Sequence, residues 1–303
     1  IHAHNIICIN IALKLAKKTD TKLIFDDHET WSLWMKLRVT AGVSYRKLLR
    51  FLLYQRVKRI EKKAAKLSDH IIVTNRKCID FYHLVYGVER ERLSEIENIA
   101  LDEEINKALS LEDLVNPIFK TDSRKKIIHV YRHPPKKGQK QFLRDQLINR
   151  KFDRIIEAQE KLEDWVLILI GKKNIELEKK GVIFLDQMPR IQYLANIAKA
   201  DVGLNPLVIN EKTAISSQNR IFEFAKLGVR IISTKTELLK ENFDDMIIWF
   251  NPDDPLEKII EILQNINKYP SGKQIKEYSK KFSWEKEMEK ILKVYEKLSG
   301  LNS

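Results

Sequence analysis

Cysteine, glycine and proline are all scarce in this chain of 303 residues, which has 2 Cys, 9 Gly and 8 Pro. With a hydrophobic fraction of 44%, this composition excludes a disordered chain and indicates a well-packed globular protein. Cys8 and Cys78 each lie in an apolar pattern, so we expect buried thiols in a reducing compartment rather than a disulfide or a metal site. No run of about 18 apolar residues occurs, so no segment is expected to span a membrane.

Several binding motifs are missing as well. Neither a Gly-x-Gly-x-x-Gly nor a Walker pattern occurs, which disfavours dinucleotide-binding and P-loop proteins. No Asp-x-Asp pair occurs, and no Ser or Cys lies in a nucleophile elbow. His2 and His4 are two residues apart, but no third ligand has a suitable spacing, so we expect no metal site.

Positive charge is concentrated in residues 34–66. The formal net charge is +13, and in this segment Glu61 is the one acid among the basic residues Lys36, Arg38, Arg46, Lys47, Arg50, Arg56, Lys58, Arg59, Lys62, Lys63 and Lys66. Leucine and aromatic residues are interleaved with them. A basic amphipathic helix of this kind is typical of binding to an anionic membrane surface. The alternative is a solvated face above a core stripe, whereas nucleic acid is disfavoured because no recognised module is present.

Apolar strand-like segments alternate with helical patterns along the chain, which predicts parallel sheets covered by helices. The predicted strands are 22–25, 70–74, 93–96, 126–131, 165–170, 182–184, 202–204 and 230–233. Helices are predicted over 6–18, 45–66, 76–85, 152–162, 191–198 and 284–298, with one more around Arg220 and Glu223. We therefore expect an α/β protein with two Rossmann-like domains facing a cleft. Their predicted bounds are 1–116, incomplete at its N-terminus, and 117–283, with a helix in 284–303 packing back toward the first domain.

Residues 200–234 carry the most informative pattern: strand, long polar loop, helix, Gly and strand. Ser216 or Ser217 is the expected N-cap of this helix, which leaves other first-turn N–H groups for phosphate oxygens. Arg220 suits a diphosphate, and Glu223, one turn further on, suits ribose hydroxyls. The alternative is an ordinary ion pair on a core helix. Ligands bind at the carboxyl ends of parallel strands, where His28, residues 131–133 and Gly171 are also expected.

Several segments, in order, resemble the family 4 glycosyltransferases of the B-type fold. They are IHAHN, KLIFDDHE, EKKAAKLSDHIIVTN, IENI, RKFDRIIEAQEKLEDWVLILIG, VIFLDQMPRIQYLANIAKADVGLNP, SSQNRIFEFAKLGVRIIST and FSWEKEMEKILKVYEKL. The resemblance covers nearly the whole chain and implies an N-terminally truncated member. The pattern differs at Ile215, where the family has a Glu that contacts the transferred sugar, and after Gly228, where the usual Pro is replaced by Val.

The resemblance implies a retaining, metal-independent hexosyl transfer from a nucleoside-diphosphate sugar, with no other cofactor. Glu223 would bind the ribose, Arg220 would replace the phosphate-binding Lys, and His28 would lie near the donor sugar as a neutral hydrogen-bond donor. Arg132 would be the first cation of the phosphate clamp. The second would be Lys137 or Arg150, of which Arg150 fits the family register better. The donor-binding set is Ser216, Ser217, Arg220, Glu223 and Gly171.

The expected acceptor is a glycan or a lipid-linked intermediate of polysaccharide biosynthesis. We expect a cytoplasmic protein that is peripheral on the inner membrane face and contacts it through the basic helix 34–66. One alternative keeps the fold and changes the reaction to that of a nucleotide-sugar epimerase. Another, suggested by Ile215, is a non-catalytic member that binds a nucleotide or a partner.

Overall fold

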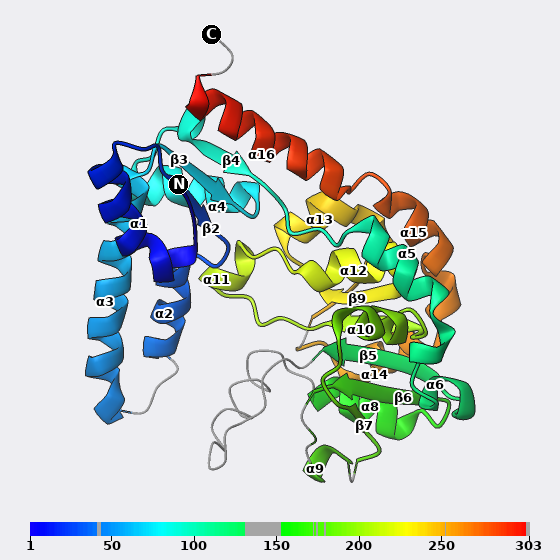
Figure 1. The fold of residues 1–303 in the computed structure, drawn as a ribbon. Helices are drawn as coiled ribbons and strands as arrows, with labels where there is room; N and C mark the ends of the chain where they lie inside the picture. Colours follow the sequence, from blue (N-terminus) through cyan, green and yellow to red (C-terminus); the bar gives the residue numbers. More distant parts are fainter. Residues whose placement is uncertain are drawn as a thin grey trace. The chain divides into compact units, whose positions relative to one another are not determined.

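The computed structural model describes residues 1–40, 44–130, 153–171, 173, 175–178, 180–251 and 253–300. The chain forms two compact units, each with its own parallel sheet (Figure 1). Unit 1 comprises Ile1–Asn98, Ile209–Ser217 and Trp284–Ser303. Unit 2 comprises Ile99–Val208 and Gln218–Ser283.

Unit 1 has a parallel sheet in the order β1-β2-β3-β4. Its strands are β1 (His2–His4), β2 (Ile24–Asp27), β3 (His70–Val73) and β4 (Leu93–Glu95). Its helices are α1 (Asn5–Thr19), α2 (Trp31–Thr40), α3 (Ser44–Leu67), α4 (Arg76–Tyr86), α11 (Glu211–Ala214) and α16 (Trp284–Ser299), with a 3₁₀ turn at Arg90–Arg92.

Helices cover both faces of this sheet. On one face α1, α3 and α4 pack on a core that includes Phe25. On the other, Val294 of α16 packs with Ile24, Ile72 and Ile96. Ile24 and Phe25 are neighbours in β2 and reach opposite faces because successive side chains of a strand alternate. The apolar run of β2 thus needs helices on both sides, which explains why the distant helix α16 belongs to this unit.

Unit 2 has a parallel sheet in the order β10-β9-β8-β5-β6-β7. Its strands are β5 (Lys125–Val130), β6 (Trp165–Ile170), β7 (Ile183–Leu185), β8 (Val202–Asn205), β9 (Arg230–Thr234) and β10 (Ile248–Phe250). Its helices are α5 (Asp102–Ser110), α6 (Ile118–Thr121), α8 (Asp153–Lys161), α9 (Ile175–Glu178), α10 (Arg190–Ile197), α12 (Asn219–Leu227), α13 (Glu237–Phe243), α14 (Leu256–Gln264) and α15 (Gly272–Ser279), with 3₁₀ turns at Glu112–Leu114, Asp244–Met246 and Ile266–Lys268.

This sheet also has helices on both faces. Ile128 of β5 packs in the core beneath α5, α10, α12 and α15, whereas its neighbour Ile127 packs in the core beneath α8 and α14. Helix α12 lies very close to β8, because Gly203 has no side chain: a Cβ there would be 2.5 Å from the ring of Phe224. Gly203 therefore fixes the position of α12, the helix of Arg220 and Glu223.

The predicted α/β class with two parallel-sheet domains is confirmed, and the predicted strands and helices reappear with shifts of a few residues at their ends. The basic helix predicted over 34–66 is two helices, α2 and α3, which pack together. Cys78 is buried as expected, Cys8 is half-buried, and both are free thiols. Among the described helices, none is both long and apolar enough to cross a membrane.

The sequence places the domain boundary at residue 116, whereas the packing groups Ile99–Val208 with unit 2. The reason is that α5 and the segment after it bury apolar side chains in the core of unit 2, among them Ile105 and Val115. The polar, Pro-containing stretch after residue 116 suggests a linker. Ile105 and Val115 lie before this stretch and already belong to the core of unit 2, so the boundary lies earlier in the chain.

Candidate functional site

The carboxyl ends of the parallel strands of unit 2 share one edge of the sheet, and α12 and α10 begin just beyond this edge. Glu223 in α12 is 3% exposed. Its Oε1 accepts a hydrogen bond from Nη1 of Arg190, and its Oε2 accepts one of 2.8 Å from the hydroxyl of Tyr193. A carboxylate oxygen has two lone pairs, so a carboxylate held in this way retains capacity for further donors.

Arg190 is fixed by two carboxylates. It contacts Glu223 and, through Nε at 3.3 Å, Glu104 of α5. Burial disfavours its charge, but Glu223 and then Glu104 raise the pKa of the Arg190 guanidinium above its ordinary value. The buried carboxylate of Glu223 is thus compensated by a permanent cation.

Arg220 lies one turn before Glu223 and contacts β5. Its Nη1 is 3.2 Å from Nε2 of His129, whose Nδ1 is 2.7 Å from the carbonyl oxygen of Leu204. His129 is fully buried, as expected for a histidine inside an apolar strand. The half-buried guanidinium of Arg220 thus lies in the first turn of α12, next to β5.

The prediction that Ser216 or Ser217 caps this helix is wrong. Helix α12 begins at Asn219, and the side chain of its N-cap, Gln218, makes no capping hydrogen bond. Ser216 instead bonds within the α11 segment: its hydroxyl donates to the carbonyl oxygen of Lys212 at 2.7 Å. The polar loop is long enough to contain the additional helix α11, and this is why the start of α12 lies further along the chain than expected.

Ile215 has a structural role in unit 1. Its carbonyl oxygen accepts a hydrogen bond of 2.9 Å from Asn75 Nδ2, and its side chain packs against the core beneath α1, α3 and α4. Residues Ile209–Ser217, which include both predicted serines, therefore belong to unit 1, whereas Arg220 and Glu223 belong to unit 2.

Gly171 directly follows β6, as predicted, and has a φ of 152°. Its N–H donates to the carbonyl oxygen of Leu185 at 2.7 Å, which places it at the same sheet edge as the start of α10. Arg132 and Arg150, the predicted phosphate-binding cations, lie outside the described residues, as does Lys137.

His28 follows β2 at the carboxyl edge of the sheet of unit 1. Its Nε2 lies 3.0 Å from Asp26 Oδ1, and its Nδ1 lies 2.8 Å from Asn98 Nδ2. Asp26 raises the pKa of His28 against the effect of burial, so the ring is protonated more readily than the expected neutral donor. Burial raises the pKa of Asp26, but contacts with His2 and His28 outweigh it and lower this pKa to about 2.

The sequence does not predict Arg190 and Tyr193 as site residues. Their spacing of three residues, just after Pro189 and a predicted strand, puts both side chains on one face of a helix start, and this is the signal that was available. Their partner Glu223 is 30 residues or more away, so the contact itself cannot be read from local spacing.

The geometry of both units is that of a known class of fold. No protein-family model matches the sequence, and no curated protein matches it. Solved structures do match. Sucrose-phosphate synthase of Thermosynechococcus elongatus has a TM-score of 0.65 at 14% identity, with 100% of this chain and 74% of that chain covered.

Two further structures agree. Anabaena HepE, solved with UDP and glucose, has a TM-score of 0.68 at 14% identity, with 98% of this chain and 78% of that chain covered. A UDP-forming trehalose-phosphate synthase of Burkholderia xenovorans has a TM-score of 0.69 at 12% identity, with 99% of this chain and 74% of that chain covered. The chain therefore resembles the B-type glycosyltransferases in its fold, with two parallel-sheet α/β domains.

Proposed function

We propose that this chain is a glycosyltransferase that moves a hexosyl group from a nucleoside-diphosphate sugar to a glycan or a lipid-linked acceptor, with retention and without a metal ion. The observation that carries the proposal is the buried carboxylate of Glu223, held by Arg190 and Tyr193 at the carboxyl edge of the sheet of unit 2. Unit 2 is then the donor domain and unit 1 the acceptor side.

Glu223 would accept hydrogen bonds from the ribose hydroxyls, using the lone pairs that Arg190 and Tyr193 leave available. The first turn of α12 has no side-chain cap from Gln218, and its N–H groups favour an anion. The diphosphate would lie there, beside the guanidinium of Arg220. Gly171 would allow the nucleotide to approach the backbone at the end of β6.

The transfer step needs stabilisation of the departing diphosphate, which gains negative charge as its bond to the sugar breaks. In this proposal Arg220 and the start of α12 supply that stabilisation, together with Arg132 and Arg150 by resemblance. These cations would act in place of a metal ion. His28 would donate a hydrogen bond to the transferred sugar or to the leaving group.

The acceptor is proposed to lie at the cytoplasmic face of a membrane. Helix α3 exposes an apolar group whose members are Leu48 at 68%, Leu49 at 60%, Phe51 at 45%, Leu52 at 56% and Leu53 at 41%. Exposed basic residues of the same helix include Lys47, Arg56 and Arg59. Exposed apolar side chains flanked by cations fit an anionic lipid surface, as a peripheral enzyme of polysaccharide biosynthesis requires.

Nucleotide binding tests the donor site. We expect calorimetric titration with the common nucleoside diphosphates to show binding of one of them, and the corresponding 2′-deoxy compound to bind more weakly. Glu223→Gln keeps the side-chain volume and removes the charge. It should weaken binding of the ribonucleotide by about 10-fold and reduce the preference for the ribonucleotide over the deoxy compound.

Glu104→Gln is the matched control, because it removes the other carboxylate partner of Arg190 and leaves Glu223 in place. Its affinity should stay close to that of the wild type. If no nucleoside diphosphate binds to the folded protein, or if Glu223→Gln binds like the wild type, the proposed donor site is wrong.

Once a donor is identified, two further assays address the reaction. Transfer should continue in EDTA, and the anomeric coupling of the product should match that of the donor sugar. Loss of activity in EDTA would contradict the metal-independent mechanism, and an inverted anomer would contradict retention.

A further inference from the structure

Unit 1 brings together a set of nitrogen and oxygen atoms that the proposed transfer does not use. His2 and His4 are two residues apart in β1, so their side chains leave the strand on the same face. In the parallel register, Asp26 of β2 is paired with His4. Adjacent strands lie about 4.8 Å apart, so this pairing places the carboxylate beside both imidazoles.

One carboxylate oxygen faces both rings. Asp26 Oδ2 lies 3.1 Å from His2 Nε2 and 3.2 Å from His4 Nδ1. One ligand atom from each of the three side chains lies within 4.8 Å of the others. The two imidazole rings are stacked, with centroids 5.0 Å apart and planes 6° apart, so both nitrogens approach the carboxylate from the same side.

We propose that His2, His4 and Asp26 form a binding site for a divalent transition-metal cation of the Zn²⁺ class. Zinc takes imidazole nitrogens and carboxylate oxygens at about 2.0–2.2 Å, so neighbouring ligand atoms in a tetrahedral site are about 3.3 Å apart. The nitrogen-to-oxygen separations around Asp26 Oδ2 are already close to this spacing. Two neutral imidazoles and one carboxylate leave a fourth position for water.

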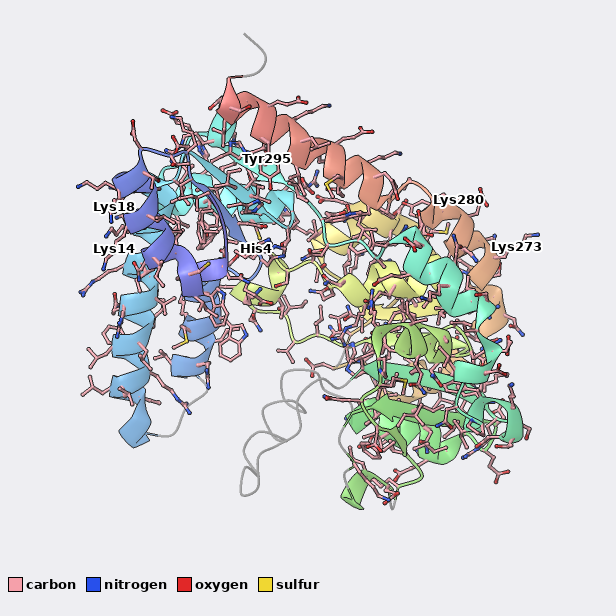
Figure 2. All side chains as sticks on the ribbon, in the orientation of Figure 1. His4, Lys14, Lys18, Lys273, Lys280 and Tyr295 are labelled. Atoms are coloured by element: carbon pink, nitrogen blue, oxygen red, sulfur yellow. The ribbon has the colours of Figure 1, made fainter. Side chains whose placement is uncertain are left out.

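The surroundings orient these ligands as they do in known metal sites. The hydroxyl of Tyr295, from α16, lies 2.6 Å from Nδ1 of His2 and so can accept a hydrogen bond from an N–H at this position. The proton of the neutral ring then stays on Nδ1, which leaves Nε2 unprotonated for the cation. The other oxygen of Asp26 faces His28. Figure 2 labels His4 on the N-terminal segment and Tyr295 on α16, the two ends of the chain that contribute to this site.

The site also has access to solvent. The side chain of Asp26 is 8% exposed and that of His2 is 21% exposed, whereas that of His4 is 63% exposed. A cation can therefore reach the carboxylate past His4, and the ligands at its inner side are held by the sheet. Among the described residues, this is the one group of three such side chains with ligand atoms so close together.

Titration of the metal-free protein with Zn²⁺ and Co²⁺ tests the proposal. We expect one equivalent of Zn²⁺ by calorimetry, visible absorption of a tetrahedral Co²⁺ complex, and a higher melting temperature with Zn²⁺ present. His4→Gln changes an exposed side chain, so it should fold, and it should weaken Zn²⁺ binding by about 100-fold. Tyr295→Phe should weaken binding by about 10-fold because the orientation of His2 is lost.

His83→Gln is the control, because it removes a histidine of α4 that bonds to Val88 outside this site. It should bind Zn²⁺ like the wild type. The proposal is overturned if the protein binds no Zn²⁺ at micromolar concentration, or if His4→Gln and Asp26→Asn both bind as the wild type does. The proposed donor site is tested separately by nucleotide binding in unit 2, so either proposal can fail alone.

Discussion

Two carboxyl groups, Asp27 and Glu61, are buried in unit 1 with 1% and 0% exposure. Glu61 accepts hydrogen bonds from the backbone N–H of Ser32 at 3.2 Å and the hydroxyl of Tyr86 at 2.6 Å. Burial and then the nearby Asp27 raise the pKa of Glu61 to about 7. The pKa of Glu61 in the folded protein thus lies near neutral pH, well above the ordinary value of a glutamate.

This shift makes the stability of the protein dependent on pH. The folded pKa of Glu61, about 7, exceeds the ordinary value of 4.5, so the native state holds a proton that the unfolded state releases between these pH values. Its contribution to the free energy of unfolding should therefore fall by roughly 3 kcal/mol from pH 4.5 to pH 7. Glu61→Gln keeps the volume and can still bond to Ser32 and Tyr86, so we expect it to remove this fall.

Urea denaturation at pH 5.5 and pH 8.5 provides the measurement. The wild type should be markedly less stable at the higher pH, and Glu61→Gln should lose most of that difference. Glu163→Gln changes an exposed carboxylate and serves as the control. Equal pH dependence in the wild type and Glu61→Gln would show that Glu61 is not the group responsible.

Single residues were predictable from the sequence where local pattern decides their environment. His129 lies within an apolar strand, and its burial with a hydrogen-bond partner follows from that pattern. The position of Asp26 beside His2 and His4 does not follow from a local pattern. The register of the parallel strands β1 and β2 pairs Asp26 with His4, which lies 22 residues earlier in the chain. The sequence therefore predicts no third ligand for these histidines.

At the scale of the elements, β8 and α12 are in close contact at the proposed donor site. We expect Gly203→Ala to force the ring of Phe224 away from β8 and to cost about 1–3 kcal/mol through overpacking. Because Phe224 adjoins Glu223, nucleotide affinity should fall as well. Thermal denaturation and calorimetry measure the two effects.

Gly87→Ala in unit 1 is a suitable control for this change. Gly87 has a φ of 68°, and nothing lies within 4 Å of the position that a Cβ would take. Its cost should therefore come from backbone strain alone, about 1 kcal/mol, with no effect on nucleotide binding. Wild-type stability and affinity in Gly203→Ala would contradict the role given to this glycine.

The helices that the sequence failed to predict include several short ones. Helices α6, α9 and α11 each have four residues, which is too short for a helical period to show. The capping error at Ser216 has the same origin, because an unseen α11 occupies the loop. Strands β5 and β6 and helices α8 and α10 of unit 2, by contrast, have strong patterns and were predicted nearly to their ends. Helices α5 and α14, with nine residues each, were not predicted.

At the scale of the whole molecule, the net charge of +13 predicts attraction to anionic surfaces, and the distribution of the charge makes that attraction local. We expect the protein to float with vesicles containing phosphatidylglycerol, and less so as salt rises. The double variant Arg56→Gln with Arg59→Gln should weaken binding by about 30-fold, at about 1 kcal/mol per cation near the lipid.

The control removes the same charge elsewhere. Lys273 of α15 and Lys280, the C-cap residue of this helix, are exposed in unit 2, and Figure 2 labels both. Lys273→Gln with Lys280→Gln should bind vesicles as the wild type does. If the two double variants lose affinity equally, total charge and not α3 attracts the protein to lipid.

The division of the chain between the units has a consequence for its synthesis. Unit 2 ends at Ser283, whereas unit 1 is completed by α16, whose Val294 closes a core with residues of β2, β3 and the segment after β4. Domains usually fold in the order in which they leave the ribosome. Here every segment of the later unit emerges before the last helix of the earlier one. The face of the unit 1 sheet that α16 covers therefore stays uncovered during synthesis until unit 2 and then α16 have left the ribosome.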